Sequence, residues 1–183
     1  MKKALFVILL IAGPISCNPP PCGGVQQYLN ITNQESIIAG LDNAGDSMFF
    51  SDLRIDTQLN TEIIALYEFK HSWTLIQFTY ACSPPPPVSE QMITKIEITS
   101  SSMFDSDHQA EDDLFELFEL SSDFNIYPTD TGIFPIAIND WNPILNLHLK
   151  NAPTLETGHV FTVTVYLDDG KRLVDTTREV VIL

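Results

Sequence analysis

Basic residues are scarce in this chain. Its 183 residues include nine lysines and arginines against 24 aspartates and glutamates, which gives a formal charge of −15. Such a surface repels nucleic-acid phosphates and anionic lipid headgroups, because binding to either depends on cations. The composition argues against nucleic acid as a partner. It leaves basic proteins, divalent cations and neutral ligands open, beside the simpler interpretation that the charge only maintains solubility.

The chain also lacks an apolar run long enough to cross a membrane. The run at residues 4–12 has nine residues, whereas a spanning helix needs about 20. Lys2 and Lys3 precede the run and Gly13-Pro14 follows it, which is the arrangement of a signal peptide. We therefore expect residues 1–16 to direct export and the rest of the chain to form the mature protein.

Cysteine is rare, and the first of the three cysteines follows this leader directly. Ser16-Cys17 resembles the end of bacterial lipoprotein signal peptides, in which a small residue precedes a lipid-modified cysteine. The resemblance predicts a lipid on Cys17 that holds the protein on a membrane, since each buried methylene contributes about 0.8 kcal/mol. Pro14 departs from the usual leucine-like residue, so ordinary cleavage near Ser16 and secretion is the alternative.

The other two cysteines, Cys22 and Cys82, form an even pair in a chain expected to be exported. In an oxidising compartment such a pair indicates a disulfide, which would close a loop worth about 4 kcal/mol in chain entropy. Two free thiols are the alternative. A zinc site is not favoured, because no histidine lies at ligand spacing from either cysteine.

Many short apolar stretches separated by turns predict a mainly β fold. We expect a Pro/Gly-rich tether over residues 17–24 and a single domain over 25–183, an antiparallel β-sandwich that is immunoglobulin-like or similar. The clearest strand is 160–167, and Asp168-Asp169-Gly170 after it predicts a hairpin. The other expected strands are 26–32, 49–57, 62–69, 73–81, 93–100, 133–138, 144–149 and 171–183.

The densest acidic stretch, Phe104–Glu116, has two interpretations. Helical spacing of apolar residues and three acids at 111–113 predict one short, dipole-matched α-helix near 107–120. The same stretch partly fits a calcium loop, with oxygen ligands at alternate positions. Its candidate ligands are Asp105, Asp107, Gln109, Asp113 and Glu116. Ala110 stands where that loop needs glycine, so we favour the helix start.

Little else in the sequence indicates chemistry. No Gly-x-Ser-x-Gly elbow and no glycine-rich phosphate loop occurs, and no two of the four histidines lie at metal-ligand spacing within one element. Trp141, in a loop-like stretch, is a candidate for contact with a sugar or a protein, with core packing as the commoner alternative. We therefore expect no cofactor and no enzymatic activity.

Several short segments together resemble a family of uncharacterised lipoproteins typical of Bacteroidota. They are the leader with its Pro/Cys/Gly sequel, Tyr80-Ala81-Cys82-Ser83-Pro84, Ile96-Glu97-Ile98-Thr99-Ser100, Phe104-Asp105 and Asp113-Leu114-Phe115. The resemblance implies a lipidated envelope protein with a Cys22–Cys82 disulfide and no assigned activity. In that group, acidic residues just after the lipidated cysteine accompany surface display. Asn18–Pro21 has none, which favours the periplasmic face of the outer membrane.

The sequence thus predicts a lipid-anchored envelope protein that binds a protein or glycan or has a structural role. Two alternatives remain open. An acidic inhibitor would capture a basic enzyme, with binding that weakens in salt. A hydrolase accessory domain, or a weak hydrolase, would need two carboxylates in a cleft, at least one of them with a raised pKa.

Overall fold

The computed structural model describes residues 25–42, 46–68, 86–122, 125–127, 133–138, 143–154 and 157–183. The chain divides into two compact units, one of residues 1–26 and 66–85 and the other of residues 27–65 and 86–183. In the first unit the described residues are only 25–26 and 66–68, which are the ends of two strands. The second unit carries the fold and is described below.

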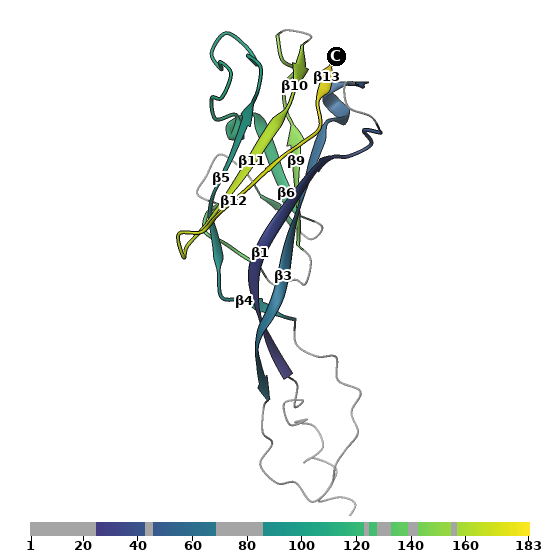
Figure 1. Ribbon diagram of the computed structural model, residues 1–183. Helices are drawn as coiled ribbons and strands as arrows, with labels where there is room; N and C mark the ends of the chain where they lie inside the picture. The colour runs from purple at the N-terminus through teal and green to yellow at the C-terminus, as the bar shows by residue number, and fades with distance from the viewer. Residues whose placement is uncertain are drawn as a thin grey trace, which may run out of the picture. The chain divides into compact units, whose positions relative to one another are not determined.

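The described chain is built from β-strands (Figure 1). In chain order they are β1 (Val25–Ile38), β2 (Ser47–Met48), β3 (Arg54–Glu68), β4 (Val88–Ser89), β5 (Met92–Ser100), β6 (Phe118–Ser122), β7 (Asn125–Tyr127), β8 (Ile136–Ala137), β9 (Ile144–Leu149), β10 (Gly158–His159), β11 (Phe161–Leu167), β12 (Arg172–Thr176) and β13 (Val180–Ile182). Two single turns of 3₁₀ helix, η2 (Phe50–Asp52) and η3 (Phe115–Leu117), complete the described secondary structure.

The strands form a β-sandwich, as the sequence predicts. A six-stranded sheet has the order β4-β1-β3-β9-β6-β7, and a four-stranded sheet has the order β12-β11-β5-β8. A three-stranded sheet, β10-β13-β2, is separate from both. Most strand pairings in the described ranges are antiparallel; β1–β4 and β13–β2 are short parallel pairs.

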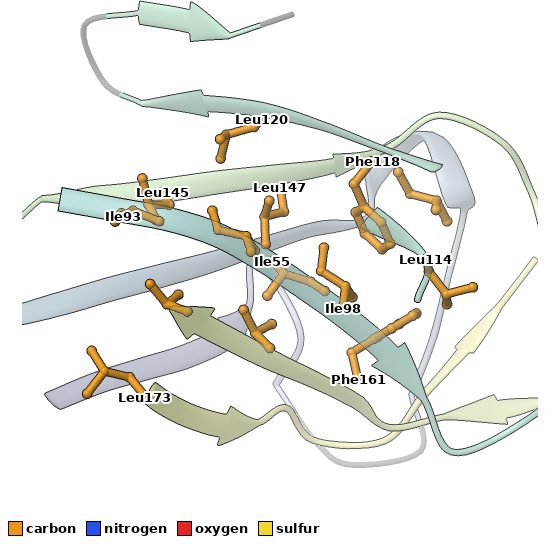
Figure 2. Close-up of a cluster of buried hydrophobic side chains, with 14 of the residues drawn as sticks. Ile55, Ile93, Ile98, Leu114, Phe118, Leu120, Leu145, Leu147, Phe161 and Leu173 are labelled. Atoms are coloured by element: carbon orange, nitrogen blue, oxygen red, sulfur yellow. The ribbon is translucent and has the colours of Figure 1, made fainter. Parts of the chain in front are cut away.

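The core lies between the six-stranded and four-stranded sheets (Figure 2). Ile55 and Leu147 come from the first sheet and Ile98 and Phe161 from the second, and all four side chains are fully buried. The rings of Phe118 on β6 and Phe161 on β11 meet edge to face, with centroids 5.8 Å apart. The burial of apolar side chains from both inner faces is the main force that holds such a sandwich together.

Strand β11 confirms the alternation expected from the sequence. From Phe161 to Leu167 every second side chain is buried, and the intervening ones are partly exposed. The hairpin that follows pairs β11 with β12 in antiparallel register, and Gly170 adopts a φ of 85°. A positive φ is readily available to glycine, so Asp-Asp-Gly suits this turn.

The edge of β1 is completed by side chains rather than by a full-length neighbouring strand. β4 pairs with only two residues of β1. Farther along, the Ile31 amide donates to Gln91 Oε1 at 2.7 Å, and the Ser36 amide donates to Asp175 Oδ2 at 2.6 Å. Lys171 Nζ donates to the carbonyls of Ile31 (2.7 Å) and Thr32 (3.0 Å). We call Gln91, Lys171 and Asp175 the β1 clasp.

The prediction of an α-helix near residues 107–120 is wrong. The structure has an irregular loop, the single turn η3 and then strand β6. Asp113 Oδ1 accepts hydrogen bonds from the amides of Ile98 and Phe115, and Glu111 adopts a φ of 68°. Short acidic side chains that bond to nearby backbone compete with helix formation, and a left-handed residue interrupts it.

Two strand boundaries also differ from expectation. β1 continues to Ile38, beyond the end at residue 32 that the sequence predicted. The inward positions of this extension carry the polar residues Gln34 and Ser36, which is why the sequence did not indicate a strand there. β3 is one strand of 15 residues where two were expected, at 49–57 and 62–69. The expected strand at 73–81 lies outside the described residues.

Candidate functional site

Four of the candidate residues lie outside the described part of the chain. They are Cys17, Cys22, Cys82 and Trp141. The lipid anchor, the disulfide and the exposed tryptophan therefore stay predictions. Within the described ranges, no helix has the length and apolar character needed to cross a bilayer.

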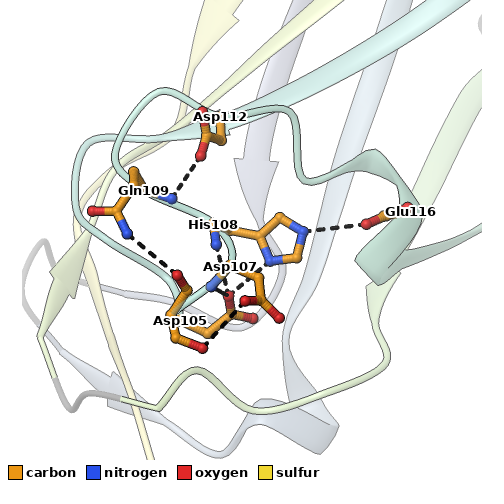
Figure 3. Close-up of polar contacts among 7 residues, drawn as sticks. Asp105, Asp107, His108, Gln109, Asp112 and Glu116 are labelled. Carbon is orange, nitrogen blue, oxygen red and sulfur yellow. Dashed lines mark hydrogen bonds and ion pairs between the residues drawn. The ribbon is translucent and has the colours of Figure 1, made fainter.

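Four of the five candidate calcium ligands lie on the loop between β5 and η3, the fifth, Glu116, lies in η3, and His108 is at the centre of the group (Figure 3). His108 Nδ1 is 2.8 Å from Asp105 Oδ1, and its Nε2 is 3.2 Å from Glu116 Oε1. Asp105 Oδ1 also accepts the amides of Asp107 (2.9 Å) and His108 (2.8 Å). One carboxylate oxygen thus organises the turn and orients the imidazole.

These contacts shift the protonation equilibria of both partners. Hydrogen bonds, first with Asp105 and then with Glu116, raise the pKa of His108 above its usual value. Desolvation raises the pKa of Asp105, but the hydrogen bonds from His108 and from the two backbone amides outweigh it, so the net shift is downward. The His108 imidazolium between two carboxylates is therefore the favoured state of this loop at mildly acidic pH.

The side chains of Asp112 and Asp113 also accept hydrogen bonds from backbone amides. Asp112 Oδ2 accepts the Gln109 amide at 2.7 Å, and Asp113 Oδ2 lies 3.4 Å from Lys95 Nζ. Within the described ranges, no three Asp, Glu, His or Cys side chains are grouped to hold a metal ion. Because a calcium site needs several oxygens converging on one point, this geometry favours a structural role for the acidic stretch.

A buried serine–histidine pair is a feature that the sequence analysis missed. Ser100 Oγ is 2.9 Å from His159 Nδ1, and the His159 ring packs against Phe104 and Phe161 with centroids 5.7 and 5.9 Å apart. Ser100 is 1% exposed and His159 is fully buried, so a substrate cannot reach either. The alternation of β11 could have revealed that His159 is buried, because His159 lies two residues before the inward-facing Phe161.

A surface pocket of about 400 Å³ lies where four distant segments of the sandwich meet. Its lining residues are Asn30, Ile64, Glu90, Gln91, Asp168 and Asp169, and we call this the acidic pocket. Gln91 is 7% exposed and donates through Nε2 to Asp169 Oδ2. The amide of Lys171 and the side chain of Gln91 both bond to Asp169 and lower the pKa of its carboxyl group.

Exposed apolar side chains border this pocket. Ile64 is 47% exposed and Met92 is 41% exposed. Met92 is joined to Asp168 by two hydrogen bonds, from the Met92 amide to Asp168 Oδ1 and from the Asp168 amide to the Met92 carbonyl, each 3.0 Å long. The pocket therefore combines acidic carboxylates with exposed apolar surface.

No protein-family model matches the chain, and no curated protein matches it either.

Proposed function

We propose that the chain is an exported lipoprotein whose β-sandwich is a non-enzymatic binding or structural module. The observation that carries the proposal is the order of the first 17 residues. A positive start, a short apolar run and a small residue directly before a cysteine are the features of a lipoprotein signal peptide, and Lys2-Lys3, residues 4–12 and Ser16-Cys17 supply them in that order, with Pro14 as the one departure from the pattern. The first partner of the protein is therefore a membrane, which the protein contacts through its lipid and not through its own surface.

The chemistry of the described side chains supports a binding role over catalysis. The carboxylates of Asp105, Asp112 and Asp113 accept backbone amides, which fixes the loop that carries them. The buried Ser100–His159 pair bonds within the core. Groups with structural duties of this kind are poorly placed to exchange protons with a substrate.

Metabolic labelling tests the anchor. The full chain is expressed in a diderm bacterium with an alkyne fatty acid, and incorporation is compared among the native protein, Cys17→Ala and Cys22→Ala. We expect label in the native protein and in Cys22→Ala, and none in Cys17→Ala, because only Cys17 receives the lipid. Equal labelling of Cys17→Ala would show that the anchor proposal is wrong.

The membrane face is tested separately, by protease treatment of intact cells and of cells with a permeabilised outer membrane. The absence of acidic residues in Asn18–Pro21 favours the periplasmic face of the outer membrane. We therefore expect cleavage only after permeabilisation. Cleavage on intact cells would place the module outside and turn the search for a ligand to external glycans and proteins.

A further inference from the structure

We infer that the acidic pocket is a docking site for a basic, partly apolar segment of another protein. This inference rests on the proposed binding role and names its site and the chemistry of the partner. It is carried by three properties of the pocket: two carboxylates without an ion-pair partner, a floor fixed by hydrogen bonds, and exposed apolar side chains in the lining or next to it in the sequence.

Two carboxylates of the pocket, those of Glu90 and Asp168, have no ion-pair partner in the described part of the chain, whereas the charge of Lys171 acts on Asp169 and helps to lower the pKa of its carboxyl group. The Glu90 side chain makes no hydrogen bond or ion pair within the described ranges, and Asp168 uses only Oδ1, for the Met92 amide. The neighbouring cation, Lys171, directs its ammonium group to the carbonyls of Ile31 and Thr32. An incoming guanidinium or ammonium group would therefore find carboxylate oxygens ready to accept its hydrogen bonds.

The floor of the pocket is fixed before any partner arrives. Gln91 is held at both ends of its amide group, by the Ile31 amide and by Asp169, and its own backbone amide donates to Ser89 Oγ at 3.1 Å. Since these bonds tie together β1, the β4–β5 segment and the β11–β12 turn, docking would require little rearrangement. Preorganisation of this kind lowers the entropic cost of association.

The border of the pocket favours a protein segment over a free small cation. Ile64, which lines the pocket, is 47% exposed, and Val88 and Met92, which lie close in sequence to the lining residues Glu90 and Gln91, are 38% and 41% exposed. An isolated amine would leave these side chains in water, whereas a segment with apolar residues beside its arginine or lysine would cover them. The formal charge of −15 would also draw a basic partner toward the module.

The test uses the full lipidated protein in a non-ionic detergent and a labelled peptide, acetyl-Leu-Arg-Leu-Arg-Leu amide. The matched peptide replaces each arginine with citrulline, which keeps the shape and removes the charge. The pocket variant is Glu90→Gln with Asp168→Asn. The control variant is Asp52→Asn with Glu119→Gln, two exposed residues outside the pocket lining, so both proteins lose the same charge. Fluorescence anisotropy gives each Kd, and circular dichroism checks that each variant is folded.

We expect the arginine peptide to bind the native protein and the control variant with Kd values within about twofold of each other. The pocket variant should bind at least tenfold more weakly, and the citrulline peptide should lose binding to the same degree. If peptide binding weakens equally in the pocket variant and the control variant, the effect is only general attraction by charge, and the acidic pocket is not the docking site. Absence of peptide binding up to millimolar concentration would overturn it too, and so would butylguanidinium binding as tightly as the peptide. None of these results touches fatty-acid labelling at Cys17, so failure of the site and failure of the anchor are distinguishable.

Discussion

Replacing Gln91 with methionine should detach one edge of β1 while leaving the volume of the side chain almost unchanged. Gln91 is 7% exposed, and its Oε1 is the acceptor for the amide of Ile31, a residue with no exposed surface. Methionine has no group that can accept this bond well. The Ile31 amide then becomes a buried donor without a partner.

A buried polar group left without its partner costs about 1–3 kcal/mol. We take ~2 kcal/mol as the expected loss in the free energy of unfolding, because Ile31 lies at a strand edge, where partial hydration is feasible. For a domain of this size that loss corresponds to a fall in Tm of about 4–8 °C. The bond between the Gln91 amide and Ser89 is made by the backbone and survives the substitution.

Urea unfolding followed by circular dichroism measures the loss, and amide hydrogen exchange locates it. We expect the midpoint to fall with an unchanged m-value, and protection to fall most at Ile31. Gln109→Met is the control, since Gln109 is exposed and its side chain makes one long contact, 3.5 Å from the Ser106 carbonyl. If Gln91→Met costs no more than Gln109→Met, the Ile31 amide does not depend on Gln91 and the reasoning fails.

Three further predictions address the core and the acidic loop. Phe161→Ala removes a fully buried ring from between the sheets and should cost about 3–5 kcal/mol by urea unfolding; a cost below 1 kcal/mol would contradict the packing. His108 has a raised pKa in the folded state, so its stabilisation is complete below the unfolded value of about 6.5 and is lost as pH rises through the folded value. His108→Gln should flatten the fall in stability as the pH rises above about 6.5, and an unchanged slope would assign that fall to other groups. Because the loop carboxylates already accept backbone amides, millimolar calcium should leave Tm unchanged; a rise of several degrees would restore the calcium interpretation.

The sequence predicted those parts of the fold in which hydrophobic period and turn chemistry agree. In β11 every second residue is apolar and the Asp168–Gly170 turn follows, so the strand and the hairpin can both be predicted from the local sequence. β1 is harder to predict from the sequence, because its inward positions include the polar residues Gln34 and Ser36. Gln34 bonds across the sandwich to the Val163 carbonyl on β11, and Ser36 bonds to Thr57 on the neighbouring strand β3. A polar residue with a distant partner looks like a loop residue until the partner is known.

The acidic stretch misled the helix prediction for a related reason. Leu114 and Phe118 are both buried, as a helical face would have them, but the chain reaches these positions through a loop and a strand. What decides the outcome is the bond from the Leu114 amide to the Ile98 carbonyl, 16 residues earlier in the sequence, together with the bond between Asp113 and the Ile98 amide. The acidic pocket could not be predicted from the sequence either, since its lining comes from four segments that are brought together only in the folded sandwich.

The β1 clasp has a consequence for how copies of this chain meet, above all if the proposed lipid anchor confines them to one membrane surface. An uncovered strand edge is a template on which another chain can extend the sheet, and molecules confined to one surface meet such edges often. In this chain the donors of Ile31 and Ser36 and the carbonyls of Ile31 and Thr32 already have partners. A neighbouring molecule must break several of these bonds before it can pair with β1. The clasp thus keeps adjacent copies from joining edge to edge.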